Sequence, residues 1–227
     1  MKTSSFFLAL AVAGLTLLGC GGLSGGTSES KLRVIHASPD APNVDVVVGG
    51  TVAFTNVPYF AEGVSTVKAG TTQIQVRPTG TSTNVINASP ALTTGNLTTV
   101  LAVNNVASIE PLVVADPDFG PGPGQARLRL VHASPSTGNV DIYITSPTAT
   151  LPATPTLANV PFKGVSDALT VSAGSYRVRI TPAGVPGTVA IDTGSIALPS
   201  NSATIAVALD KAGGGSPLTA RTYTASY

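Results

Sequence analysis

The chain has 227 residues, of which 43% are hydrophobic, 10% charged and 5% aromatic, and its net charge is +1. A charged fraction this far below the ~25% of average soluble proteins argues against a charge-rich helical bundle, a coiled coil or a nucleic-acid-binding protein. The 24 Gly and 18 Pro, with abundant Thr and Val, favour β structure with many turns.

Residues 1–19 have the pattern of an export signal. Lys2 supplies one positive charge, and the apolar run at residues 6–18 is too short to span a membrane. The sequence Leu17-Leu18-Gly19-Cys20 resembles a bacterial lipobox. This resemblance implies that Cys20 becomes the first mature residue and carries acyl chains such as palmitate. The alternative is a plain secretory signal that is cleaved near Gly19.

The mature protein is expected to start with the lipidated Cys20 and a flexible tether, together residues 20–30. The ten Gly- and Ser-rich residues that follow Cys20 span about 17 Å as a random coil. Removal of Lys2 with the signal leaves 11 basic and 11 acidic residues, so no net charge attracts nucleic acid. We expect the membrane to be contacted through the lipid. Gly21, and not an aspartate, follows the cysteine. By resemblance to the sorting rules of double-membraned bacteria, this implies the outer membrane or cell surface.

A tandem duplication organises the rest of the chain. The segment Leu32-Arg33-Val34-Ile35-His36-Ala37-Ser38-Pro39 recurs, with conservative changes, at residues 128–135. Further matches follow in the same order: Asn43-Val44-Asp45 with Asn139-Val140-Asp141, Asn56-Val57-Pro58 with Asn159-Val160-Pro161, and Ala69-Gly70 with Ala173-Gly174. A repeat of about a hundred residues has the size of a whole domain. We therefore expect a first domain at 31–115, a Pro/Gly linker at 116–126 and a second domain at 127–227.

Each repeat is predicted to consist of short strands separated by turns. Gly49-Gly50 indicates a hairpin, and residues 73–77 alternate polar and apolar side chains with the period of a strand. Residues 97–103 and 204–209 are nearly all apolar, which is typical of central strands buried on both faces. The predicted fold class is all-β, with two tandem immunoglobulin-like β-sandwich domains.

These motifs together resemble a bacterial surface family known as domain of unknown function 4397. The shared pattern is His-Ala-Ser-Pro, then Asn-Val-Asp, then Asn-Val-Pro with an aromatic, then Ala-Gly before an alternating strand. The resemblance implies an exported, often lipid-anchored and often tandem protein, with no established molecular role. The second copy departs from the first in one turn, where Ser136-Thr137-Gly138 replaces Asp40-Ala41-Pro42.

The duplicated motif could be read as a catalytic Ser-His-Asp arrangement. His36, Ser38 and Asp45 recur as His132, Ser134 and Asp141. However, nothing resembles a nucleophile elbow, and a serine before a proline commonly serves a turn. We therefore interpret these residues as a structural turn motif and expect no catalytic residue. The complete motif consists of His36, Ser38, Asn43 and Asp45 in the first copy and His132, Ser134, Asn139 and Asp141 in the second.

Metal and glycan sites are the other candidates. Calcium could use Asp40 with Asp45, or Asp116 with Asp118, but two carboxylates make a weak cage. No metal site and no cofactor are therefore expected. Exposed aromatic side chains for stacking on a sugar are few, and the best are Tyr59, Phe60 and Phe162.

The function expected from the sequence is a non-enzymatic, lipid-anchored envelope protein with a structural or binding role. Its partner would be another envelope protein or a glycan. The alternatives are a carbohydrate- or calcium-binding module and, from another class, a serine hydrolase. We also expect the linker to keep the two domain cores separate, so that a substitution in one domain would leave the melting of the other unchanged.

Overall fold

The computed structural model describes residues 28–116 and 120–226. The predicted signal peptide, Cys20 and most of the tether lie outside the described residues. Among the described residues, no helix is long and apolar enough to cross a membrane.

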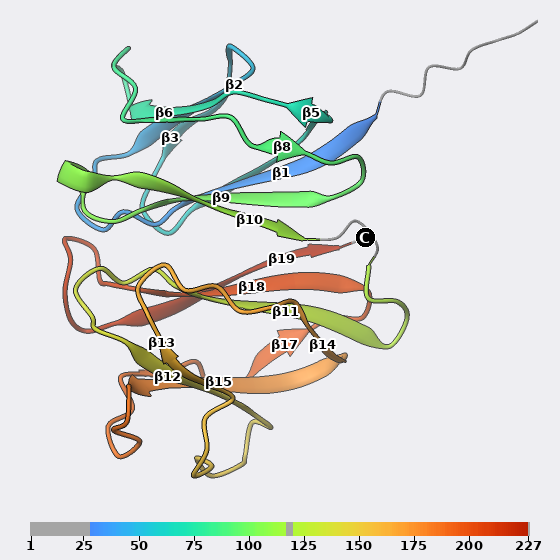
Figure 1. Cartoon of the computed structure of the whole chain (residues 1–227), viewed down its shortest axis with the longest axis vertical. Helices are drawn as coiled ribbons and strands as arrows, with labels where there is room; N and C mark the ends of the chain where they lie inside the picture. The colour runs from blue at the N-terminus through green and yellow to red at the C-terminus, as the bar shows by residue number, and fades with distance from the viewer. Residues whose placement is uncertain (1–27, 117–119, 227) are drawn as a thin grey trace, which may run out of the picture.

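The described part of the chain is built from strands, which confirms the predicted all-β class (Figure 1). The first repeat contains β1 (Glu29–His36), β2 (Val44–Val48), β3 (Thr51–Val57), β4 (Glu62–Lys68), β5 (Gly70–Thr71), β6 (Ile74–Pro78), β7 (Ile86–Ala88), β8 (Ala91–Leu92), β9 (Leu97–Val103) and β10 (Glu110–Asp116). The second contains β11 (Gln125–His132), β12 (Val140–Thr145), β13 (Leu157–Val160), β14 (Leu169–Ser172), β15 (Gly174–Pro182), β16 (Ile191–Asp192), β17 (Ile196–Leu198), β18 (Ser202–Leu209) and β19 (Thr219–Ser226).

Each repeat folds as a sandwich of two main sheets. In the first repeat the inner sheet has the order β10-β9-β1-β4 and the outer sheet β3-β2-β6-β7. In the second repeat the corresponding orders are β14-β11-β18-β19 and β13-β12-β15-β16. Neighbouring strands are antiparallel except for one parallel pair in each inner sheet, β1 with β9 and β11 with β18. The β-sandwich architecture predicted from the sequence is therefore present in both repeats.

Strand bounds differ from the expected domain limits by a few residues. The first strand begins at Glu29, inside the predicted tether, because Glu29 and Ser30 pair with the end of β4. Asp116 ends β10, and β11 starts at Gln125, so strands enter the predicted linker from both sides.

Each sandwich has an apolar core between its two sheets. Every residue of β9 and every residue of β18 is buried. This confirms the prediction that these apolar runs form central strands. In the first sandwich, Leu32 and Val34 of β1 pack with Val46 of β2 and Val76 of β6. The second core is formed in the same way by Leu128, Leu130, Ile142 and Ile180, among others.

A third apolar cluster joins the two repeats. The two inner sheets face each other, so the molecule has four stacked layers (Figure 1). The shared cluster contains residues of both repeats: Ile35, Ala37, Leu101, Val103, Val114, Val131, Ala133, Ile205, Val207, Leu209 and Tyr223. The expectation of separate cores is therefore wrong. Because alternate residues of a strand face opposite sides, β1, β9, β11 and β18 each supply one row to their own sandwich and one to the shared layer.

Polar contacts join the two repeats at both edges of the shared layer. The Tyr59 hydroxyl donates to the backbone carbonyl of Asp210 at 2.9 Å, and the Tyr223 hydroxyl donates to the carbonyl of Phe60 at 2.8 Å. At the opposite rim, Arg129 Nε lies 2.6 Å from Asp116 Oδ1. Burial raises the pKa of Tyr223 to about 12, which keeps its hydroxyl protonated as the donor.

Truncation inside the shared layer should therefore destabilise both repeats together. We expect Leu101→Ala to lower the free energy of unfolding by about 2–5 kcal/mol, the usual cost of emptying a buried leucine site. Differential scanning calorimetry should show one transition at a lower temperature for the whole chain. Val113→Ala, at an exposed position of β10, is the matched control and should melt almost like the wild type. A second transition that stays at the wild-type temperature would contradict the shared layer.

Candidate functional site

The duplicated motif lies where the chain crosses from the inner to the outer sheet of each sandwich. His36 is the last residue of β1, and the seven residues that follow it lead to β2. His132 ends β11 in the same way. Both imidazoles are buried, with 1% and 0% exposure. The motif thus has to satisfy buried polar groups at the point where the backbone leaves one sheet for the other.

Both ring nitrogens of each histidine bond to the backbone of its own turn. His36 Nε2 lies 3.0 Å from the Pro42 carbonyl oxygen, and the Ser38 N–H donates to His36 Nδ1 at 3.4 Å. His132 makes the equivalent contacts with Gly138 and Ser134 at the same distances. Since a carbonyl can only accept, Nε2 carries the hydrogen and the ring is neutral. Burial lowers the pKa of both histidines, against the smaller raising effect of the carbonyl bond.

The two aspartates contact a different part of the fold from the histidines. Asp45 Oδ1 accepts from the Asn56 N–H at 3.0 Å and from the Thr79 hydroxyl at 3.1 Å. The Asn56 bond is the main reason that the pKa of Asp45 is lowered. In the second repeat, Asp141 accepts from the N–H groups of Asn159 at 2.7 Å and Gly184 at 2.8 Å. Asp45 therefore joins the end of β3 to the loop that follows β6. Asp141 joins the end of β13 to the loop that follows β15.

The motif asparagines Asn43 and Asn139 bind the same turns as the two aspartates. Asn43 Nδ2 donates to Asn56 Oδ1 at 2.9 Å, and Asn139 Nδ2 donates to Asn159 Oδ1 at 2.8 Å. Asn56 and Asn159 both have a φ of 54°, in the left-handed region that asparagine tolerates better than most residues. The sequence repeat had shown Asn56 and Asn159 as matching positions, but their contact with the motif required the structure.

The serines do not complete a catalytic arrangement. Ser38 Oγ is buried and has no hydrogen-bond partner among the described residues, while its backbone N–H occupies the ring nitrogen that a catalytic base would need. Ser134 Oγ instead bonds to the Asp210 carboxylate and lies 2.7 Å from Thr137 Oγ1. Neither aspartate of the motif contacts a histidine; both accept from loop groups. In each motif the serine thus contacts the histidine ring through its backbone N–H and not through its hydroxyl.

Asp210 is a buried residue that the sequence analysis missed. Its side chain is 1% exposed and accepts from the hydroxyls of Ser134 and Ser136 and from the Gly215 N–H at 3.0 Å. Its backbone carbonyl accepts from Tyr59 of the other repeat. The available signal was its position, since an acid that directly follows an all-buried strand needs several donors.

The calcium candidates are occupied by protein groups. Asp40 Oδ1 accepts from the Val106 N–H at 2.7 Å, and Asp116 pairs with Arg129. Asp118 lies outside the described residues. Within the described ranges, no three His, Cys, Asp or Glu side chains come together as a metal cluster.

The candidate aromatic residues pack against the protein. Tyr59 and Phe60 cover the shared cluster, and the Arg221 guanidinium lies 4.8 Å from the centre of the Phe60 ring. The rings of Phe162 and His132 are nearly perpendicular, with their centres 6.3 Å apart. These three side chains do not form an exposed platform for a sugar ring.

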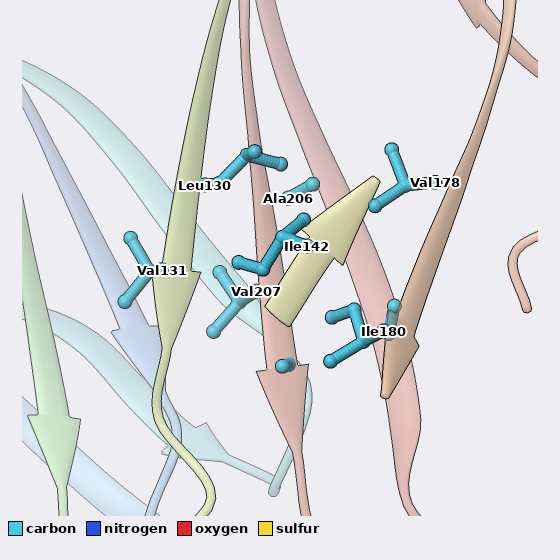
Figure 2. A pocket seen from close by; sticks show the side chains of 9 residues that line it. Leu130, Val131, Ile142, Val178, Ile180, Ala206 and Val207 are labelled. Atoms are coloured by element: carbon cyan, nitrogen blue, oxygen red, sulfur yellow. The ribbon is translucent and has the colours of Figure 1, made fainter. Parts of the chain in front are cut away.

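Two cavities differ in size and in exposure to solvent. One lies in the core of the second sandwich, has a volume of about 10 Å³, and is lined by apolar residues such as Leu130, Ile142 and Val178 (Figure 2). It is large enough for about one water molecule and offers that molecule no polar partner. The other is an open hollow of about 580 Å³ over the outer sheet of the second repeat, lined by Asp141, Tyr143 and several Ala and Pro residues.

The sequence comparison identifies the first repeat. The profile of the family described as Domain of unknown function (DUF4397) matches residues 30–143, half of the chain. The chain belongs to the DUF4397 family. The match begins at the second residue of β1, includes β2–β11 and continues through the second His-Ala-Ser-Pro to the second Asn-Val-Asp. No curated protein matches the sequence.

Two solved structures show a remote likeness to this DUF4397 protein. One is a family 26 carbohydrate-binding module from Eubacterium rectale in complex with maltoheptaose, which is 10% identical over 87% of this chain and 97% of that chain, with a TM-score of 0.28. The other is a candidate adhesin from Bacteroides ovatus, which is 10% identical over 82% and 90% of the two chains, with a TM-score of 0.19. TM-scores this low carry no functional weight.

The histidine contacts predict a specific pH dependence of stability. Because both folded-state pKa values lie below the ordinary 6.5, the histidines contribute stability above pH 6.5 and lose it as the pH falls towards the folded pKa. Each histidine can contribute a slope of up to about 1.4 kcal/mol per pH unit. Urea denaturation between pH 5.5 and 7.5 should show this loss, and a His36→Gln, His132→Gln double variant should show a flatter profile. Equal slopes would mean that the histidines are not held neutral.

The aspartate contacts predict a stability defect. Asp141→Ala leaves the N–H groups of Asn159 and Gly184 without their acceptor, so we expect a loss of about 1–3 kcal/mol in urea denaturation. The loss should be seen in the unfolding of the whole chain, since the shared layer couples the repeats. Asp192→Ala, which removes an exposed ion pair with Arg177 and an exposed acceptor of the Gly194 N–H, is the control and should cost less because water reaches both groups. Equal effects of the two substitutions would argue against the role of Asp141 in the fold.

Proposed function

We propose that this protein is a non-enzymatic module of the cell envelope, held at the membrane by a lipid on Cys20 and serving a structural or binding role. The observation that carries the proposal is the use of the duplicated motif. Its histidines, the only two in the chain, each give both ring nitrogens to the backbone of their own turn. A general base needs one ring nitrogen available to a substrate or nucleophile.

The motif is accordingly proposed to be structural in both copies. His36 and His132 close the crossover turns, while Asp45 and Asp141 fix the loops at the same end of the outer sheets. The asparagines hold the left-handed residues that those loops require. We infer that any partner is bound by surfaces other than this motif.

The proposed anchor rests on the sequence pattern before Cys20. A short charged start, an uncharged apolar run and the Leu-Leu-Gly-Cys ending are the features of a lipoprotein signal. A single acyl chain binds a membrane weakly and several bind stably, so a multiply acylated cysteine would retain the protein at the membrane. The tether would then allow the two-sandwich unit to take any orientation near the bilayer.

Fractionation tests the anchor directly. Wild-type protein should partition into detergent with lipid on Cys20, whereas Cys20→Ala should be released as soluble protein or accumulate as the precursor. Mass spectrometry of the mature N-terminus identifies the modification. A Cys20→Ala protein that is cleaved and still membrane-bound would rule out the lipid anchor.

A fluorophosphonate probe tests the non-enzymatic part of the proposal. We expect no covalent labelling of the wild-type protein, since neither motif serine is bonded to a histidine ring nitrogen through its hydroxyl. The control is a Ser38→Ala, Ser134→Ala double variant. Labelling of the wild type that this variant loses would establish the serine hydrolase alternative instead.

A further inference from the structure

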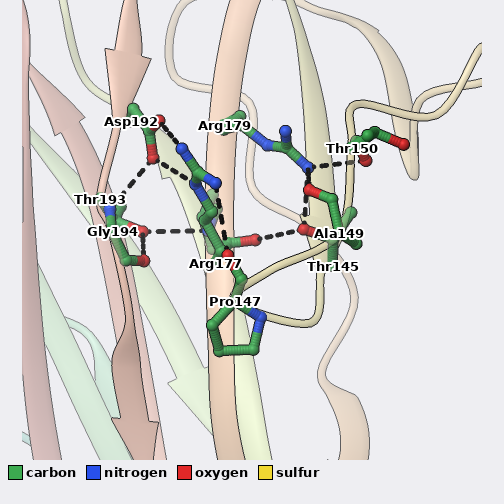
Figure 3. A network of polar contacts seen from close by, with 10 residues as sticks. Thr145, Pro147, Ala149, Thr150, Arg177, Arg179, Asp192, Thr193 and Gly194 are labelled. Atoms are coloured by element: carbon green, nitrogen blue, oxygen red, sulfur yellow. Dashed lines mark hydrogen bonds and ion pairs between the residues drawn. The ribbon is translucent and has the colours of Figure 1, made fainter.

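The two repeats differ on the exposed face of the outer sheet. In the second repeat, residues 146–156 connect β12 to β13, and Pro147, Ala149 and Thr150 of this segment contact two arginines of β15 (Figure 3). In the first repeat, the corresponding strands β2 and β3 are joined by Gly49 and Gly50 alone. The short turn leaves the outer face of the first repeat without an equivalent cover.

The cover of the second repeat is a peptide held by its backbone. Arg179 Nη2 donates to the carbonyls of Ala149 and Thr150, each at 3.0 Å, and Arg177 Nη1 donates to the carbonyl of Pro147 at 3.3 Å (Figure 3). The segment reads Ser-Pro-Thr-Ala-Thr-Leu-Pro-Ala-Thr-Pro-Thr and carries no charge. Its placement leaves Arg179 only 6% exposed. In the second repeat this sheet face thus holds a Thr- and Pro-rich segment of its own chain through backbone carbonyls.

Strand register identifies the same positions in the first repeat. Gln75 pairs with Val47 of β2 and Asn87 of β7, as Arg179 pairs with Tyr143 of β12 and Asp192 of β16. Gln75 therefore occupies the position of Arg179. By the same register, Gln73 and Asn87, whose side chains bond at 3.1 Å, replace the ion pair of Arg177 with Asp192.

Several polar side chains of this face are exposed or lack a hydrogen-bond partner among the described residues. Gln73 and Asn87 are exposed, and the Gln75 side chain makes no hydrogen bond within the described part of the chain. Arg77, on the same face, has a buried Nε that lacks a hydrogen-bond partner among the described residues. Val52 is 42% exposed beside them. We call Val47, which is 5% exposed, together with Val52, Gln73, Gln75, Arg77 and Asn87 the outer face of the first repeat.

We propose that the outer face of the first repeat binds an uncharged, Thr- and Pro-rich peptide segment of a partner protein, in the way that the second repeat binds its own residues 146–156. Gln75 and Arg77 lie two residues apart on β6, so their side chains share this face and can donate to backbone carbonyls, as Arg177 and Arg179 do in the second repeat. No aromatic side chain belongs to this face, so it lacks the stacking surface that favours a sugar. The proposal rests on a surface location of the protein, which gives a partner access.

The test uses the peptide of residues 146–156 as the probe. It is titrated to millimolar concentration into 15N-labelled protein that contains the tether and both repeats, residues 21–227. We expect amide shifts confined to β2, β3, β6 and β7. Gln75→Glu, which keeps the shape but replaces the amide donor with a negative charge, should weaken binding by about tenfold. Gln75→Arg, which copies the second repeat, should tighten it. Thr222→Ala, exposed on β19, is the control and should bind like the wild type.

Several results would overturn the peptide site. These are the absence of shifts at millimolar peptide, shifts centred elsewhere, or equal affinity of both Gln75 variants. A glycan from a soluble panel that shifts this face when the peptide does not would assign it to carbohydrate instead. The amide spectrum of each variant shows whether it is folded. None of these results depends on Cys20 or the serine probe, so failure of this site leaves the proposed anchored, non-enzymatic role to its own tests.

Discussion

The architecture depends on burying both faces of each inner sheet. The central strands β9 and β18 are buried at every residue, and a single sandwich can cover only one face of a sheet. Each repeat by itself would therefore leave a row such as Leu101 and Val103, or Val207 and Leu209, in contact with water. Packing the two inner sheets together removes both rows at once. The duplication thus produces one four-layered unit in which the repeats stabilise each other.

This constraint explains where polar groups are concentrated. Between the inner sheets no backbone group needs a partner outside its own sheet, so apolar contact suffices. At the ends of β1 and β11 the chain must leave the sheet beside this apolar layer, and its free N–H and carbonyl groups require local partners. A neutral histidine can accept at one nitrogen and donate at the other, which few side chains can do. The same need accounts for Asp210 at the end of β18, where hydroxyls and a backbone N–H surround a buried carboxylate.

Much of the fold was predictable from local patterns. The repeat, the Gly49-Gly50 hairpin and the strand at residues 97–103 follow from turn chemistry and hydrophobic periodicity, and the structure contains them. The sequence also indicated that β9 and β18 are buried on two faces, yet separate cores were predicted. The two statements conflict, because the second face needs a third layer, and that layer is the other repeat. Contacts such as Tyr59 with Asp210 join residues far apart in the chain and could not be predicted without knowing how the sheets pack. At the motif, residue types indicated a satisfied turn, but which carbonyl each histidine meets depends on the backbone path.

Native-state hydrogen exchange tests the shared layer most directly. The amides of β9 and β18 lie in different repeats and at the centre of the same four-layered unit. If the layer couples the repeats, these amides should exchange only through unfolding of the whole chain, with the same free energy of opening and the same dependence on denaturant. Exchange of β9 at a distinctly lower free energy while β18 remains protected, or the reverse, would show that one sandwich opens without the other and would contradict the account.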